Sequence, residues 1–331
     1  MSNFILYLGI DVSKLTLDLA CTIDGQTIFT SRSVENNLSG FKTAFEWANK
    51  HAQKQKCTSI HVCIEATGRY SEEVMVFFQQ LSLKVSLINP AQVKSFGKSI
   101  MLRTKTDKVD AQLIALYSAK MQPPATPKLP EELIELKKLV RHLDSLIKQR
   151  AQQKTRLESA THSIIINSIN ESITHFNKQI KEIEKLIKDH VTKYPLLQKN
   201  IDLLTSIQGI GEKTARILLC ELYPQEQGHI DAKAQTAHAG LAPSQKQSGT
   251  SVHGKSAICK AGNSYLRNCL YLPALVATRH NSVINEFYNR LLAKSKPKKV
   301  ALIACMRKLL VISIGVLNNN TSFDPNWSKQ N

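Results

Sequence analysis

The order of strand and helix patterns near the amino terminus restricts the fold more than any other feature. Residues 4–34 have the pattern of three short strands, with a hairpin turn at Asp24-Gly25 between the second and the third. A helix pattern over about 39–53, a strand at 60–64, a helix at 71–81 and a strand at 84–88 follow. Three antiparallel strands followed by helix-separated strands predict a mixed α/β sheet.

This order of elements is the one that an RNase H-like fold requires. In such a fold the middle of the first strand and the end of the fourth lie side by side. Asp11 interrupts the apolar first strand, and Glu65 ends the apolar run of the fourth. We therefore expect these two carboxylates to converge. The alternatives are a hydrogen-bonded structural aspartate and a surface carboxylate.

Asp107 and Asp110 form a second acidic pair, and their spacing of three places both on one helix face. Taken alone, they could be a solvated face beside Arg103, Lys105 and Lys108. Acidic groups inside a protein are costly unless a cation binds them. With Asp11 and Glu65 they predict a site for one or two Mg²⁺ ions and phosphoryl-transfer chemistry.

The charge of the chain indicates a polyanionic partner. Its 331 residues include 44 Lys and Arg against 26 Asp and Glu, a formal net charge of +18. Nucleic acid is the first choice for such a protein. We expect no membrane association, because no uninterrupted apolar run reaches the roughly 18 residues of a spanning helix. The seven cysteines contain no CxxC pair, and no signal segment opens the chain, so we expect a cytoplasmic protein.

Residues 130–192 are glycine-free and polar, with one periodic apolar stripe. The stripe predicts two long helices that form an antiparallel coiled-coil arm or an oligomerisation element. A helical hairpin packed on its own domain remains an equal alternative. The expected domains are therefore an N-terminal catalytic domain at 1–128, a helical arm at 129–195 and a C-terminal domain at 196–331.

The C-terminal domain opens with a Gly-Ile-Gly turn between two helix patterns. Gly209, Gly211 and Lys213 fit a helix-hairpin-helix, whose second helix can hold a phosphate at its amino end. An ordinary helix turn is the alternative. Lys260 and Arg267 are further candidate phosphate contacts, and a solvated basic face explains them equally well. The Ser/Gly-rich loop around Ser248 reads from composition as a flexible linker, with Lys255 nearby.

Several short motifs, in order along essentially the whole chain, resemble the DEDD-type insertion-sequence transposases (the IS one-ten family). They are Gly9-Ile10-Asp11, Ile64-Glu65-Ala66-Thr67-Gly68, Asn89-Pro90, Lys105-Thr106-Asp107-xx-Asp110-Ala111, Gly209-Ile210-Gly211-xx-Thr214-Ala215, Gly240-Leu241-Ala242-Pro243, Ser248-Gly249-xx-Val252-xx-Gly254 and Lys260-Ala261-Gly262-Asn263-xx-Leu266-Arg267. The motif positions show no departure from the family pattern.

The resemblance implies a mechanism and partners. By position, Ser248 matches the family's DNA-attacking serine, and the N-terminal domain is similar to Holliday-junction resolvases. Family members bind a structured bridge RNA whose loops pair with donor and target DNA. They act as tetramers in which the carboxylate site of one protomer meets the serine of another. The expected function is guided recombination through a phosphoserine link; a metal-dependent junction nuclease and a non-catalytic nucleic-acid-binding protein are the alternatives.

Overall fold

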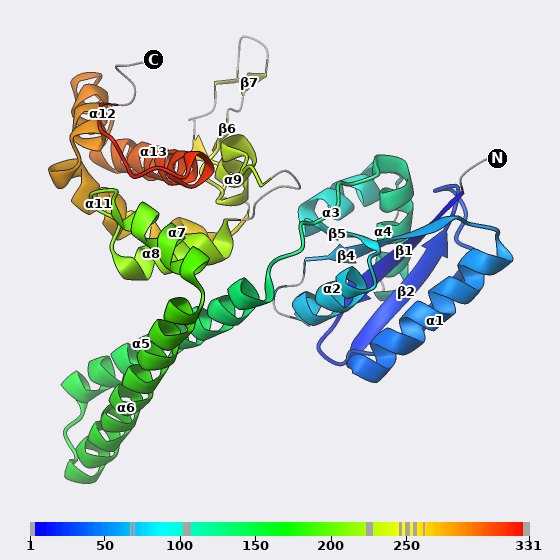
Figure 1. The fold of residues 1–331 in the computed structure, drawn as a ribbon, viewed down its shortest axis with the longest axis horizontal. Coiled ribbons are helices and arrows are strands. Elements are labelled where there is room, and N and C mark those ends of the chain that lie inside the picture. Colours follow the sequence, from blue (N-terminus) through cyan, green and yellow to red (C-terminus); the bar gives the residue numbers. More distant parts are fainter. Residues whose placement is uncertain are drawn as a thin grey trace. The chain divides into compact units, whose positions relative to one another are not determined.

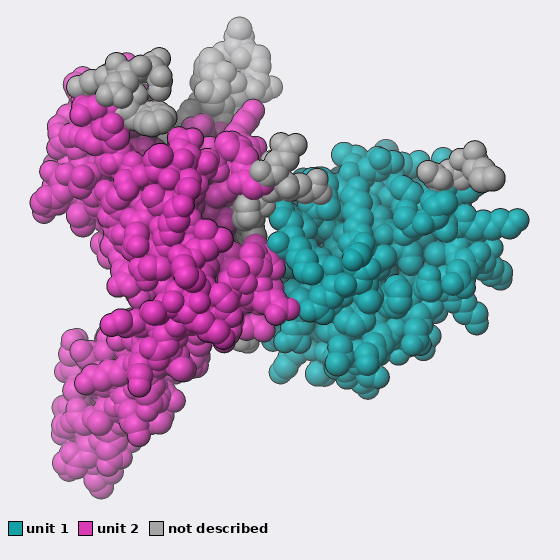
Figure 2. Space-filling model, in the orientation of Figure 1, with its two compact units in different colours: residues 1–128 teal, residues 129–331 magenta. Residues whose placement is uncertain are grey.

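The chain divides into two compact units, Met1–Lys128 and Leu129–Asn331 (Figure 2). In this computed structural model, the described residues are 4–66, 68, 70–101, 107–222, 228–244, 247–248, 252–253, 257–260 and 262–326. Each unit has its own hydrophobic core.

The first unit is built on a five-stranded sheet with helices on both faces (Figure 1). Its elements are β1 (Ile5–Val12), β2 (Thr16–Thr22), β3 (Thr30–Glu35), α1 (Leu38–Lys54), β4 (Ser59–Glu65), α2 (Tyr70–Gln80), β5 (Lys84–Ile88), α3 (Pro90–Ser99) and α4 (Asp107–Met121). The strand order is β3-β2-β1-β4-β5, in which β1 pairs antiparallel with β2 and parallel with β4. The predicted mixed α/β sheet is confirmed.

Alternation along β1 and β4 separates the two faces of this sheet. Leu6, Leu8 and Ile10 join Phe41 of α1 and Phe78 of α2 in one core. The alternate residues face α4. A Cβ on Gly9 would lie 2.9 Å from the Cα of Ala115 and closer still to backbone atoms of Ala111 and Ala115. Only glycine lets α4 approach β1 this closely.

The helix α3 was not expected from the sequence. Its signals are nevertheless local: the Asn89 side chain accepts a hydrogen bond from the amide of Ala91, and Pro90 occupies the first helical turn. The Asn-Pro pair therefore begins a helix here and does more than end the preceding strand.

The second unit is mostly helical, and its first two helices form an antiparallel hairpin (Figure 1). Hydrogen bonds from His190 to the carbonyl of Glu132 (2.8 Å) and from Arg150 to Asn177 (2.9 Å) link the two helices along their length. The elements are α5 (Glu131–Ser159), α6 (Ser163–Lys193), α7 (Pro195–Thr205), α8 (Glu212–Glu221), α9 (Ala232–His238), β6 (Pro243–Ser244), β7 (Gln247–Ser248), β8 (Val252–His253), β9 (Ala257–Ile258), α10 (Ser264–Cys269), α11 (Tyr271–His280), α12 (Ser282–Ala293) and α13 (Lys298–Asn319).

One core runs through this unit and includes the first half of α5 and the second half of α6. Leu136 of α5 and Ile187 of α6 belong to the same apolar cluster as Leu309 and Leu310 of α13. Among the described helices, α13 alone is long and apolar enough to cross a membrane, and half of its most apolar window is buried. Helices at the core of a globular protein have the same composition, so this is weak evidence for a membrane span.

Candidate active site

The strand register places the first two predicted carboxylates at the same edge of the first unit's sheet. Ile10 of β1 lies beside Ile64 of β4, so Asp11 and Glu65 follow at adjacent positions on parallel neighbours. Both occupy the alternation that faces α4, and both are half-buried. The sheet order therefore places these two positions side by side.

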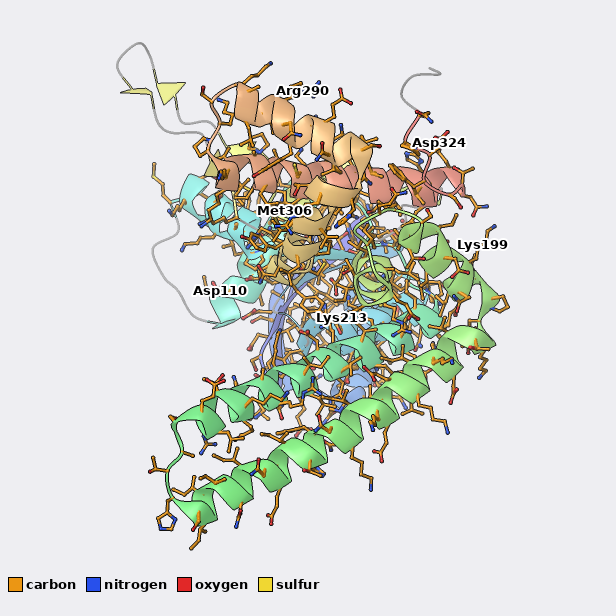
Figure 3. All side chains as sticks on the ribbon, turned by 90° about the vertical axis from the view of Figure 1, so that its left-hand side faces the viewer. Asp110, Lys199, Lys213, Arg290, Met306 and Asp324 are labelled. Carbon is orange, nitrogen blue, oxygen red and sulfur yellow. The ribbon has the colours of Figure 1, made fainter. Side chains whose placement is uncertain are left out.

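Helix α4 brings the second acidic pair to this edge. Gly9 of β1 lies against Ala111 and Ala115, whereas Gly25, beyond the far end of β2, lies against Ala119 and Lys120. The helix therefore begins at the carboxylate edge and runs away from it. Asp110 stands in its first turn and is half-buried (Figure 3).

Asp18 is an acidic neighbour that the sequence reasoning did not select. It is the register partner of Asp11 across the antiparallel β1–β2 ladder. Leu17 and Leu19 face the α1–α2 core, so Asp18 faces α4, on the same side as Asp11. Like charges at directly opposed positions repel, and a cation relieves that repulsion. The strict alternation of residues 17–21 was the available signal.

The described side chains do not by themselves form a finished metal site. Among them, no three His, Cys, Asp or Glu lie close enough together to hold a metal ion. The side chain of Asp107 lies outside the described residues, as do residues 102–106 before it. The donor set consists of carboxylate oxygens, which suits Mg²⁺.

In the second unit, Ser248 lies near the end of a two-tiered β-hairpin, called here the serine hairpin (residues 243–258). Pro243 and Ser244 of β6 pair with Ile258 and Ala257 of β9. Farther out, Ser248 of β7 pairs with Val252 of β8. The side chain of Ser248 and all of Lys255 lie outside the described residues.

The Gly-Ile-Gly segment joins α7 to α8. Gly209 has a φ of +104°, and a Cβ there would lie 2.8 Å from the Cβ of Ala277 on α11. Gly211 is the residue before α8, and no side chain caps this helix by a hydrogen bond. Lys213 is exposed, and its Nζ lies 3.9 Å from Oδ1 of Asp144 on α5 (Figure 3).

The residues that flank the serine hairpin, 239–242 on one side and 259, 260 and 263 on the other, are called here its base. Lys260 belongs to this base, and Arg267 of α10 contacts it. Lys260 is exposed. The Nη1 of Arg267 donates to the backbone carbonyls of Ala239 (2.9 Å) and Lys260 (3.3 Å), so this guanidinium already binds the protein's own backbone. Its phosphate contact stays a prediction.

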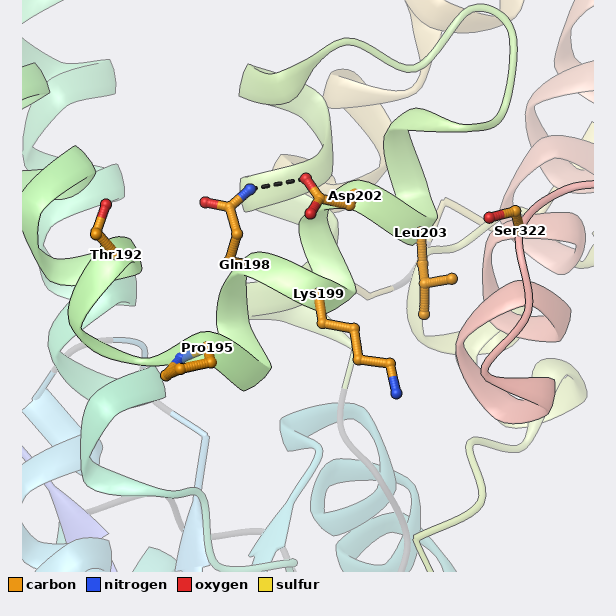
Figure 4. Close-up of a pocket in the computed structure, with 7 residues that line it drawn as sticks. All are labelled: Thr192, Pro195, Gln198, Lys199, Asp202, Leu203 and Ser322. Atoms are coloured by element: carbon orange, nitrogen blue, oxygen red, sulfur yellow. Dashed lines mark hydrogen bonds between the residues drawn. The ribbon is translucent and has the colours of Figure 1, made fainter.

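A pocket elsewhere in the second unit contains none of these residues (Figure 4). The side chain of Gln198 donates to Asp202, one turn further along α7, at 2.7 Å. The lining residues are Thr192, Pro195, Gln198, Lys199, Asp202, Leu203 and Ser322.

Comparison with known proteins covers both candidate regions. Residues 8–166, with all four predicted carboxylates, match a family described as transposase, the DEDD-type IS110 class. Residues 201–289, which span the Gly-Ile-Gly turn and the serine hairpin, match the transposase IS116/IS110/IS902 family.

Relatives extend over nearly the whole chain. The pilin gene-inverting proteins of Moraxella bovis and Moraxella lacunata are each 35% identical over 320 residues, which is 96% of this chain and 97% of theirs. A protein of insertion element IS110 from Streptomyces coelicolor is 28% identical over 166 residues, 50% of this chain and 40% of its own.

Proposed function

We propose that this chain, which belongs to the IS116/IS110/IS902 family of transposases, cuts and rejoins DNA through a covalent phosphoserine intermediate. The observation that carries the proposal is the topology of the first unit: the ends of β1 and β4 and the first turn of α4 lie at one edge of the sheet, and each contains an acidic residue. We assign this unit (1–128) to the RNase H-like fold on its strand order. The relatives named for pilin gene inversion support DNA recombination as the class of reaction.

The carboxylates Asp11, Glu65, Asp107 and Asp110 would hold one or two Mg²⁺ ions. Family members of the DEDD type commonly use a divalent metal. Bound there, Mg²⁺ would neutralise charge on the scissile phosphate. The four carboxylates would set where those ions lie relative to the sheet edge.

Ser248 would supply the nucleophile. Its Oγ forms a bond to the scissile phosphorus, the bond from phosphorus to one sugar oxygen breaks, and the serine proton passes to solvent while the sugar oxygen gains one. A free hydroxyl of the exchanged strand then attacks the phosphoserine, and the serine oxygen leaves with a proton. The number of phosphodiester bonds is conserved, so no external energy source is required.

The partners would be donor and target DNA, and a noncoding bridge RNA that pairs with both. Between Asp231 and Asp324 the sequence contains a single acidic residue, Glu286, so this stretch has a strong positive charge. The proposed phosphate contacts are Gly209, Gly211 and Lys213 of a helix-hairpin-helix, together with Lys255, Lys260 and Arg267.

We further propose a cytoplasmic homotetramer. The arm at 129–195 would act as a coiled coil between protomers, separate in role from the C-terminal domain at 196–331. The carboxylate edge of one protomer would then meet the serine hairpin of another.

The test is a covalent adduct between the full chain and DNA carrying the element's own ends, resolved on a denaturing gel with Mg²⁺ and the flanking RNA present. Wild type should form an adduct that survives SDS, and Ser248→Ala should form none. Ser251→Ala, in the same hairpin, is the matched control and should retain the adduct. An adduct that persists in Ser248→Ala would overturn the serine assignment.

A metal-dependent junction endonuclease is the second candidate, favoured by a carboxylate edge that belongs entirely to the first unit. It would use water as the nucleophile. Free 5′-phosphate nicks without any adduct, formed equally by Ser248→Ala, would establish this alternative.

A further inference from the structure

Glu221, the last residue of α8, is a buried carboxylate outside both candidate sites. It follows the apolar run Ile217-Leu218-Leu219-Cys220, and its side chain is 2% exposed. One oxygen, Oε1, accepts hydrogen bonds from Nη2 (3.0 Å) and Nε (3.3 Å) of Arg141 on α5. The other, Oε2, accepts from Nδ2 of Asn263 at 2.7 Å. A buried carboxylate with three donors is a satisfied group, and loss of any partner is costly.

Asn263 connects this carboxylate to the base of the serine hairpin. Its backbone amide donates to the carbonyl of His238 at 2.6 Å, and its Oδ1 accepts from the amide of Leu266 and so caps α10. One asparagine thus joins α8, the end of α9 and the start of α10. Substitution at this position affects three elements at once.

The two strands that leave this base are fixed to each other by backbone hydrogen bonds. The amide of Cys259 donates to the carbonyl of Ala242 at 3.0 Å, and that of Lys260 donates to Gly240 at 3.2 Å. The Arg267 guanidinium adds hydrogen bonds to the carbonyls of Ala239 and Lys260 at the same base. These hydrogen bonds tie the base together, and Ser248 lies in the strand pair that follows it along the chain.

We infer that Glu221 is a positioning residue that couples the arm helix α5 to the serine hairpin. Arg141 on α5 and Asn263 at the hairpin base meet on opposite oxygens of one carboxylate, so a shift of α5 is transmitted to the base through a single rigid group. The inference rests on the proposed role of Ser248. It goes further in assigning to the arm an effect on catalysis within its own protomer.

Exchange of donor and acceptor gives a specific test. In Glu221→Gln, the new amide confronts the Asn263 amide, donor against donor. In Asn263→Asp, two carboxylates confront each other. In the double variant, the amide introduced at position 221 can donate to the carboxylate introduced at position 263. The carbonyl oxygen left at position 221 can still accept from Arg141, and the new carboxylate can still cap α10. The double variant also keeps the local net charge.

We expect each single variant to slow adduct formation by about tenfold or more, with DNA affinity within about threefold of wild type. The double variant should recover to within about threefold. Hydrogen exchange should quicken at the amides of Cys259, Lys260 and Asn263 in the single variants and recover in the double. Slower adduct formation with nearly unchanged DNA affinity indicates a positioning role for Glu221. A loss of folding stability alone would reduce DNA binding and cleavage together.

Adduct formation and exchange at wild-type rates in both single variants would overturn the inference, as would failure of the double variant to recover either. If Glu221→Gln does not fold, Asn263→Ser is measured in its place, because serine still caps α10 but does not extend to Glu221 as asparagine does. If wild type forms no adduct, the proposed function fails. The exchange measurement then decides by itself whether Glu221 anchors the hairpin base.

Discussion

Asp11 and Glu221 are both acidic residues in apolar runs, and they differ in burial and in position. Asp11 is half-buried at a sheet edge, and its register partner is another carboxylate, Asp18. Glu221 is buried beneath three hydrogen-bond donors. The same sequence pattern, an acidic residue among apolar neighbours, therefore occurs both at a half-buried strand end and at a fully buried, hydrogen-bonded position.

Asp11→Asn tests whether Asp11, unlike Glu221, holds a metal ion, and we expect the largest effect from it. Loss of one metal-holding carboxylate should lower DNA cleavage by about a thousandfold or more. Mg²⁺ should raise the melting temperature of wild type by mass action and have no such effect on Asp11→Asn. Glu221→Gln is the contrasting variant and should keep the full Mg²⁺ response. An equal Mg²⁺ response in Asp11→Asn and wild type would show that Asp11 does not hold the ion.

Gly9→Ala tests whether the carboxylate edge depends on close packing of α4. The new Cβ would overlap backbone atoms of Ala111 and Ala115, so α4 has to move and carry Asp107 and Asp110 with it. We expect a loss of about 3 kcal/mol in the unfolding free energy of the first unit. Gly211→Ala is the control, because no atom beyond its neighbours in the chain lies within 4 Å of its Cβ position, and it should cost about 1 kcal/mol or less. Urea melts of both variants measure the difference.

A buried histidine makes the first unit sensitive to acid. His61 is 2% exposed and shares a 2.8 Å hydrogen bond with Ser86; burial, with a smaller contribution from Lys84, lowers its pKa to about 4. Between about pH 6.5 and 4 the unfolded chain binds more protons than the folded one. The stability that depends on neutral His61 is therefore fully present above pH 6.5 and is lost as the pH falls toward 4, by about 3 kcal/mol at most.

Urea melts across this pH range measure the effect. The sequence contains two tryptophans, Trp47 in α1 and Trp327 near the carboxyl terminus. In a Trp327→Phe background, the fluorescence of Trp47 reports on the first unit alone. His61→Gln should flatten the pH dependence of that unit. A slope unchanged by His61→Gln would show that other groups cause it.

The sequence predicted the first unit well because local periodicity and strand order determine its sheet. Asp11 and Glu65 were expected at one edge because the order of elements predicts that β1 and β4 are neighbours, and the parallel register places the two residues at adjacent positions. Asp18 required the antiparallel register, which the hairpin length determines only approximately. The buried carboxylate Glu221 had the same local signal as Asp11.

What the sequence could not supply was the set of partners of Glu221. Arg141 and Asn263 lie 80 and 42 positions away along the chain, and no local pattern joins such residues. The partners of Arg267 could not be predicted from the sequence either. Its charge predicted a phosphate contact, whereas its bonds to the Ala239 and Lys260 carbonyls depend on how the hairpin base folds back.

Substitution of Lys213 should have the smallest effect, and it tests whether this lysine contacts nucleic acid or is only a surface charge. Lys213 and Lys148 are both exposed, and both lie near the carboxylate of Asp144, at 3.9 and 2.7 Å. If Lys213 contacts a phosphate, Lys213→Ala should lower the slope of log K against log salt for DNA binding by about one. Lys148→Ala makes the same change in net charge beside the same aspartate and should leave that slope unchanged. Equal slope changes in both variants would mean that the amino end of α8 contributes only general positive charge, and that the Gly-Ile-Gly turn is held by its packing against α11.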